Sequence, residues 1–198
     1  MKNQIVYLFI ILNSFFVNAQ ENVKVCDENQ ANFKKFIQEN NFDDAQLLIN
    51  NILKNCPSAN ENFYIDTEKL HKHNLEFATT DAEKLASIQD LIKNYDLFDK
   101  KFPDNKHGNT TKKAIYLYDN NIGSKNDVYT ILDKLFTSKP QNFINPRAFY
   151  IYYELFEKKS LATNSIIKLD DLISKNIAIS KQNNTLQNLL NTEIDLIL

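Results

Sequence analysis

One apolar pattern occurs twice in this chain and constrains its fold more than any other feature. It places apolar residues at i, i+3, i+4, i+7 and i+8, with a proline at i+12. The two copies are Ala45, Leu48, Ile49, Ile52, Leu53, Pro57 and Val128, Ile131, Leu132, Leu135, Phe136, Pro140. This spacing is one apolar stripe of an α-helix that ends before a residue unable to continue it. A recurring stripe with its stop signal predicts stacked repeats around a shared core.

Helical patterns continue along most of the chain. The predicted helices cover residues 28–39, 42–55, 61–78, 81–101, 109–121, 125–138, 146–159, 164–179 and 183–198. Short connections favour antiparallel neighbours, which gives hairpins at 28–55, 61–101, 109–138 and 146–179 and an unpaired last helix at 183–198. The sequence therefore predicts an all-α domain of stacked antiparallel hairpins.

Several helix ends carry their own signals. Thr80-Asp81-Ala82-Glu83 is a capping box, and Ser124-Lys125-Asn126-Asp127 resembles one. Asn145 stands before a proline at the first position of a helix. Pro57, Pro103 and Pro140 are expected to follow helix ends, since proline is disfavoured inside a helix.

The first nineteen residues have the pattern of a signal peptide. Lys2 gives a positive start, residues 5–16 form an apolar run, and Val17-Asn18-Ala19 is a small-residue cleavage site before Gln20. An uncleaved anchor helix is the alternative, but the run is short for a membrane span. We expect an exported protein, located in the periplasm, at the outer membrane or outside the cell, with residues 20–198 as one helical-repeat domain.

The composition disfavours several function classes. The chain has 2 glycines, whereas phosphate-binding loops need several. Its formal net charge of −2 gives no sign of the basic surface that binds nucleic acid. No serine lies in a glycine-flanked elbow, and only 3 histidines are present. We expect no catalysis, no cofactor and no nucleic-acid partner.

The histidines give little support for a metal site. His71 and His73 are two residues apart on a predicted helix, so they point to different faces. Glu68 and His71 have the i, i+3 spacing of di-metal bundles, which also need a second such motif. His107 lies in a predicted loop. We expect polar roles for these side chains and no bound metal.

Cys26 and Cys56 are the only cysteines and favour one disulfide. They stand at the outer ends of two helices of similar length, which an antiparallel hairpin brings together. Closure of this loop would stabilise the fold by about 3–4 kcal/mol. Two free thiols, or a metal site that lacks further ligands, are the alternatives. Lipid attachment at Cys26 would need a small residue before it, where Val25 stands.

Residues 45–57 resemble the second half of a tetratricopeptide repeat. That family places a small residue early in its second helix and a proline twelve positions later, as Ala45 and Pro57 do here. Phe36 stands where the family has an aromatic residue in its first helix. The sequence departs from the family at Asn29, where tryptophan is frequent, and at Phe33, where a small residue is usual.

A second resemblance is to secreted tetratricopeptide-type proteins of Bacteroidetes-type bacteria. It rests on Asn55-Cys56-Pro57, Asn62-Phe63-Tyr64-Ile65 and Tyr95-Asp96, although Phe98 replaces the arginine that this group has after Tyr-Asp-x. The resemblance covers residues 28–140. It implies a right-handed solenoid that acts as a binding scaffold.

In tetratricopeptide scaffolds the first helix of each hairpin lines a concave groove. The resemblance therefore implies a partner-binding groove with Tyr64, Lys72, Lys112, Tyr116, Tyr150 and Tyr153 as candidate residues. Tyrosine suits such a surface because a large apolar ring carries a polar tip. The alternative for helix 146–159 is core packing, since it is apolar on most sides.

The leading functional hypothesis is an exported scaffold that binds a protein or peptide partner in the cell envelope. One alternative is a small-ligand-binding or enzymatic envelope protein with a pocket between helices. Another is a structural module that self-associates through 183–198, whose apolar stripe ends the chain without a polar cap. A chain cut short at Leu198 would also explain that stripe.

We predict that the exported protein has no free thiol, because both cysteines are oxidised in one bond. Thiol labelling under denaturing conditions without reductant should leave both cysteines unmodified, and labelling after reduction should modify both. Modification of both residues before reduction would contradict the disulfide.

Overall fold

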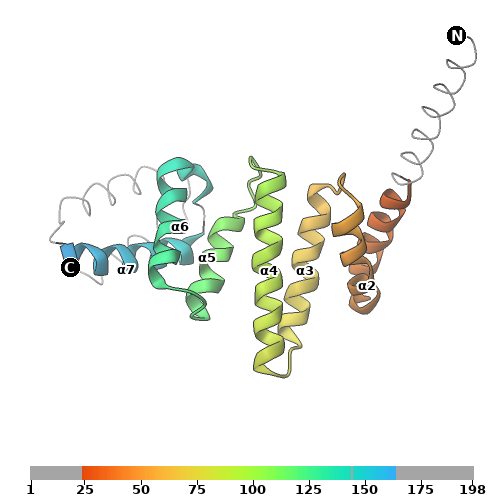
Figure 1. The fold of residues 1–198 in the computed structure, drawn as a ribbon, viewed down its shortest axis with the longest axis horizontal. Helices are drawn as coiled ribbons and strands as arrows, with labels where there is room; N and C mark the ends of the chain where they lie inside the picture. Colours follow the sequence, from red (N-terminus) through yellow and green to blue (C-terminus); the bar gives the residue numbers. More distant parts are fainter. Residues whose placement is uncertain (1–23, 144, 164–198) are drawn as a thin grey trace, which may run out of the picture. The chain divides into compact units, whose positions relative to one another are not determined.

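The computed structural model describes residues 24–143 and 145–163 (Figure 1). These residues form helices and short connections, and none of them lies in a strand. The all-α prediction is confirmed for this part of the chain. The predicted signal peptide with its Ala19–Gln20 cleavage site, and the predicted helices at 164–179 and 183–198, lie outside the described residues.

The helices follow the predicted order. The first covers residues 24–38, and the others are α2 (Phe42–Asn55), α3 (Glu61–Glu76), α4 (Asp81–Lys101), α5 (Asn109–Asp119), α6 (Lys125–Ser138), the 3-10 turn η1 (Pro140–Asn142) and α7 (Pro146–Thr163). The first helix begins before residue 28, and α7 continues past the predicted end at 159. Residues 160–163 contain neither proline nor glycine, so nothing in the sequence stops α7 earlier.

The capping signals act as the sequence predicts. The Glu83 carboxylate accepts a hydrogen bond from the Thr80 backbone amide at 3.0 Å. The Glu83 backbone amide donates a hydrogen bond to the Thr80 hydroxyl at 3.2 Å. Ser124 and Asp127 form the equivalent reciprocal pair at the start of α6. The Asn145 side chain accepts from the Arg147 amide at 2.9 Å. These bonds satisfy N–H groups that have no partner inside their own helix.

The chain divides into two compact units, and the boundary falls between Asn94 and Tyr95, within α4. In the first unit, Cys26 and Cys56 form the predicted disulfide, with their Cα atoms 5.4 Å apart. The bond joins the first helix to the end of α2. Beside these helices, the rings of Phe33 and Phe63 pack with centroids 5.2 Å apart.

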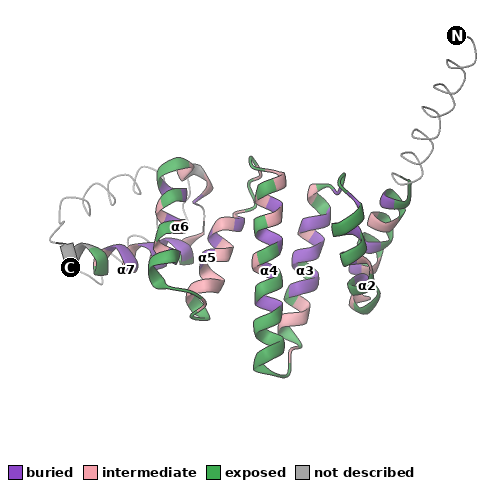
Figure 2. Ribbon diagram, viewed as in Figure 1, coloured by how far each residue is buried: buried purple, intermediate pink, exposed green. Residues whose placement is uncertain are grey.

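Helix α3 is buried along most of its length, and several of its buried side chains are polar (Figure 2). Among them, Glu68 forms an ion pair with Lys72 at 2.7 Å. His71 is buried, and burial lowers the pKa of its imidazole. His73 instead stacks on Phe42 of α2, with ring centroids 3.8 Å apart. The two histidines thus have different surroundings, as their spacing predicts.

In the second unit, α5, α6 and α7 each pack against the other two. Their shared core is formed by Ala114, Val128, Leu132, Leu135, Phe136, Phe143, Ala148, Phe149, Ile151, Tyr152, Leu155 and Phe156. Aromatic residues of α7 therefore supply much of the core, as the packing alternative for this helix predicted. The apolar stripe of α6 faces this core directly.

The two copies of the apolar pattern differ at their i+8 position. Ala45, Ile49 and Ile52 are buried in the first copy, and their counterparts are buried in the second. Leu53, however, is 36% exposed, whereas the equivalent Phe136 is 6% exposed. The rings of Phe143 and Tyr152 cover Phe136 at centroid distances of 5.8 and 5.4 Å. Residues that follow Pro140 thus cover Phe136, whereas Leu53 has no such cover and stays partly exposed.

This difference predicts unequal effects of truncation at the same pattern position. Phe136→Ala should lower the free energy of unfolding by about 3–5 kcal/mol, because it leaves a cavity in a packed core. Leu53→Ala, the matched control, should cost less than about 1 kcal/mol. Urea unfolding followed by far-ultraviolet circular dichroism measures both, and equal losses would contradict the assigned burial.

Candidate partner-binding surface on α5 and α7

The six residues predicted for a partner-binding groove fall in both units. Tyr64 and Lys72 belong to the first unit. The other four, Lys112, Tyr116, Tyr150 and Tyr153, belong to the second.

Tyr64 was predicted to line a groove, but its side chain is buried. Its side chain is 5% exposed, and burial raises the pKa of its hydroxyl. Asn94 of α4 donates its side-chain amide to the Tyr64 carbonyl at 3.0 Å, so α4 covers this part of α3. Lys72 is exposed and pairs with Glu68 of its own helix. The sequence did not predict this burial, because α3 has buried residues on more than one side.

Tyr153 lies at the edge of the second unit's core. Its ring packs against that core and is partly buried. Burial raises the pKa of its hydroxyl, and the nearby Glu157 carboxylate adds to the effect. The side chain therefore contributes mainly to packing, which was the alternative expected for this helix.

Lys112 and Tyr116 lie one turn apart on α5, and both contact the ring of Tyr95 on α4. The Tyr116 ring stacks on Tyr95, with centroids 6.4 Å apart and an interplanar angle of 27°. The Lys112 ammonium lies 5.6 Å from the centroid of the same Tyr95 ring, a cation–π geometry. Lys113 pairs with Asp96 at 2.7 Å. These contacts hold α5 against the part of α4 that belongs to the second unit.

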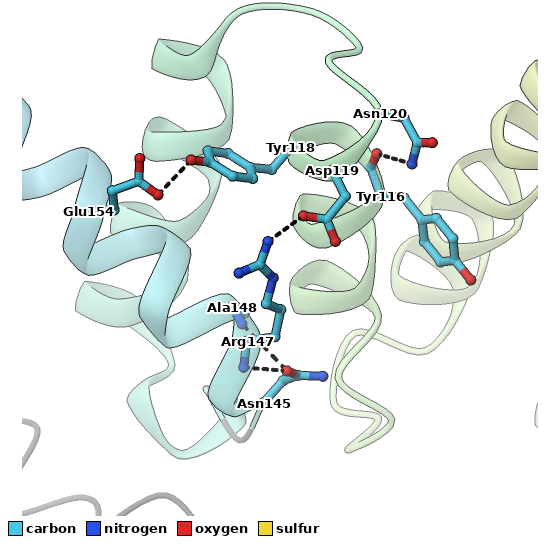
Figure 3. Close-up of polar contacts among 8 residues, drawn as sticks. All are labelled: Tyr116, Tyr118, Asp119, Asn120, Asn145, Arg147, Ala148 and Glu154. Atoms are coloured by element: carbon cyan, nitrogen blue, oxygen red, sulfur yellow. Dashed lines mark hydrogen bonds and ion pairs between the residues drawn. The ribbon is translucent and has the colours of Figure 1, made fainter. Parts of the chain in front are cut away.

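Arg147 links the start of α7 to the end of α5 (Figure 3). Its guanidinium donates to the Asp119 carboxylate at 2.7 Å, and this hydrogen bond raises the pKa of Arg147. The guanidinium carbon also lies 6.0 Å from the ring centroid of Tyr118 and 5.5 Å from that of Tyr150. The Asn145 cap at the beginning of α7 fixes the backbone from which Arg147 projects.

A second polar bridge between these helices joins Tyr118 to Glu154 (Figure 3). The Tyr118 hydroxyl donates to the Glu154 carboxylate at 2.6 Å. Burial and this carboxylate raise the pKa of Tyr118 to about 12. Lys158 also bonds to Glu154, and together with Tyr118 it lowers the pKa of that carboxyl.

We call the polar and aromatic residues along these two helices the α5–α7 surface and define it by Lys112, Tyr116, Tyr118, Asp119, Arg147, Tyr150 and Glu154. On α5, Lys112 and Tyr116 contact α4, whereas Tyr118 and Asp119 are directed to α7 (Figure 3). The tyrosine side chains of this surface are half-buried, and the Tyr118 hydroxyl is hydrogen-bonded to Glu154. The charges are held in place by ion pairs and ring contacts. Such an arrangement suits recognition of another chain by aromatic contact and hydrogen bonding.

The sequence predicted Lys112, Tyr116 and Tyr150 for a groove but did not predict the polar bridges that join α5 to α7. Arg147 is the only arginine in the chain, which was a usable signal. Arginine is favoured over lysine where a planar group must pair with a carboxylate and lie against aromatic rings. Asp119 and Glu154 had no comparable signal, because their roles depend on contact between α5 and α7.

No protein family, curated protein or solved structure matches this chain in the three comparisons made. Among residues 24–143 and 145–163, no helix is long and apolar enough to cross a membrane.

We predict that Tyr118 stays protonated well above pH 10 in the folded protein. Its raised pKa of about 12 means that its contribution to stability is present below pH 10 and is lost as pH rises through 12. Glu154→Gln should move the pKa of Tyr118 back toward 10, and Glu157→Gln should not. Tyrosine-ring NMR titration, assigned with Tyr118→Phe, measures this. An unchanged Tyr118 pKa in Glu154→Gln would rule out the bridge.

Proposed function

We propose that this chain is an exported helical-repeat scaffold of the tetratricopeptide type, which binds a protein or peptide partner through the α5–α7 surface and has no catalytic activity of its own. The observation that carries this proposal is the direct packing of α5 on α7. Each is the first helix of its hairpin in the predicted repeat, so their contact is the arrangement expected for a groove lined by first helices.

The repeat assignment is supported by the packing within the second unit. Helices α5 and α6 pack as a hairpin, and α7 packs against both. This is the arrangement expected when a hairpin stacks on the first helix of the next repeat. The apolar stripe of α6 and its following proline match those of α2, which is the sign of repetition in the sequence itself.

The chemistry of the α5–α7 surface supports binding of another chain. Tyrosine and arginine are enriched among the residues that contribute most to protein–protein affinity. Here the ring of Tyr150 and the guanidinium of Arg147 lie against each other, and Asp119 holds the guanidinium in position. Side chains that are already ordered lose less conformational entropy when a partner binds.

An envelope location is part of the proposal. It rests on the leader pattern at residues 1–19 and on the Cys26–Cys56 disulfide, since stable disulfides are typical of exported proteins. The partner is then expected to be an envelope protein or peptide.

Site-specific photo-crosslinking tests the proposal. A photoreactive phenylalanine at position 116 or 150 should capture the same partner in the native envelope. The same probe at exposed Thr130 on α6 should not capture it. Equal capture from all three positions, or from none, would argue against the α5–α7 surface.

With the captured partner in hand, we expect Arg147→Ala to weaken its binding by about tenfold or more, because a hot-spot side chain is removed. Lys134→Ala, which also removes one positive charge but lies outside the surface, should leave the affinity unchanged. Titration calorimetry with the purified pair measures both variants.

A further inference from the structure

The charges of helices α5 and α7 are not balanced. Together the two helices contain five positively and three negatively charged residues, whereas the whole chain contains 23 positive and 25 negative ones. For a binding partner, the important charges are those that have no counter-charge within the protein. The carboxylates and the cations of the α5–α7 surface differ in this respect.

Both carboxylates of the α5–α7 surface are already bound to other side chains. Asp119 accepts a hydrogen bond from the Arg147 guanidinium at 2.7 Å. Glu154 bonds to Lys158 and accepts a hydrogen bond from the Tyr118 hydroxyl at 2.6 Å, and these contacts lower the pKa of the Glu154 carboxyl. A basic partner would therefore have to compete with cations of the protein itself.

The Arg147 guanidinium, in contrast, has unused hydrogen-bond donors. A guanidinium carries five N–H groups, and among the described residues only Asp119 accepts a hydrogen bond from this one. The Arg147 side chain is 48% exposed and lies against the rings of Tyr118 and Tyr150. Planar guanidinium groups bind carboxylates through pairs of N–H donors. Arg147 is thus positioned to bind a second carboxylate from outside.

Lys125, at the start of α6, adds a second cation beside the same tyrosine. Its ammonium lies 5.4 Å from the ring centroid of Tyr118, and the Arg147 guanidinium carbon lies 6.0 Å from that centroid. The Lys125 side chain is exposed and forms no ion pair within residues 24–143 and 145–163. Its charge lowers the pKa of Glu154 without direct bonding. Two cations therefore border one aromatic ring.

Two further carboxylates do not neutralise this pair. Asp127 lies in the same turn as Lys125, but its carboxylate accepts hydrogen bonds from the backbone amide and hydroxyl of Ser124 and caps its own helix. Glu157 lies ten residues beyond Arg147 on α7, which is about 15 Å along the helix. The region around Tyr118 therefore attracts negative charge.

We propose that the segment bound by the α5–α7 surface is acidic, with aspartate or glutamate side chains that pair with Arg147 and Lys125. An apolar side chain of the same segment packs on the ring of Tyr150. Because two cations border the Tyr118 ring, at least two carboxylates are needed, and neighbouring side chains of one segment supply them. This inference rests on the proposed function, since it names the class of partner for the same surface.

Selection from a random peptide library tests the partner class without knowledge of the natural partner. The peptides are displayed on phage and selected in parallel on the purified protein and on its Arg147→Ala variant. Peptides that bind only the unaltered protein should contain aspartate and glutamate about twofold or more above the starting library, because complementary charge favours them.

The outcomes of this selection separate the two proposals. Peptides that depend on Arg147 but show no acidic enrichment would overturn the acidic assignment and leave the proposed binding surface standing. Absence of any peptide that depends on Arg147 would count against both the acidic assignment and the surface.

Lys125→Gln provides a matched test with the tightest selected peptide. Its side chain is exposed and forms no ion pair, so the fold should stay intact. We expect the affinity to fall by about threefold or more in titration calorimetry. Lys134→Gln removes the same charge from α6 outside the surface and should bind like the unaltered protein. Equal affinities of the two variants would contradict the assignment of Lys125.

Vesicle binding distinguishes an acidic peptide from an anionic lipid surface. In cosedimentation with phosphatidylglycerol vesicles, we expect no binding that depends on Arg147 or Lys125. Vesicle binding that is lost in both Arg147→Ala and Lys125→Gln would assign the two cations to a lipid surface and would overturn the acidic-peptide proposal.

Discussion

The packing of Tyr152 between α6 and α7 determines the geometry of the second unit. Its ring lies within 5.4–5.7 Å of the ring centroids of Phe136, Tyr129 and Phe143. Its hydroxyl donates to Asp133 at 2.6 Å, so the one polar group of this buried side chain is satisfied. Burial and that carboxylate raise the pKa of Tyr152, which keeps the hydroxyl a donor. This contact sets the rotation of α7 about its own axis.

That rotation decides which residues of α7 meet α5. With Tyr152 directed into the core, Arg147, Tyr150 and Glu154 fall at i, i+3 and i+7 along another face of the helix. Arg147 and Glu154 then reach Asp119 and Tyr118. The α5–α7 surface thus follows from core packing, and a change in the core would disturb the proposed binding face. In the first unit the disulfide has the corresponding role, because it fixes the first helix against the end of α2.

Much of the fold follows from local sequence signals. The capping residues at Thr80, Ser124 and Asn145 and the prolines after α2, α4 and α6 locate helix ends without any knowledge of tertiary contacts. The pairing of Cys26 with Cys56 followed from helix lengths. Burial was harder to predict: Tyr64 was expected in a groove and is covered by α4, because α3 is buried on more than one side. Periodicity shows one apolar face of a helix but not how many neighbours it has.

Within the described residues, the sequence by itself determined which segments are helical, where most of them begin and which cysteines pair, since these depend on backbone propensity, capping and chain length. Only the tertiary structure decided how deeply the last position of each apolar pattern is buried. Leu53 is partly exposed, whereas Phe136 is covered by residues that follow Pro140. The tertiary structure also brought Arg147 to Asp119 and Glu154 to Tyr118. Both arrangements join side chains from different helices, and contacts between helices depend on packing that no single helix specifies.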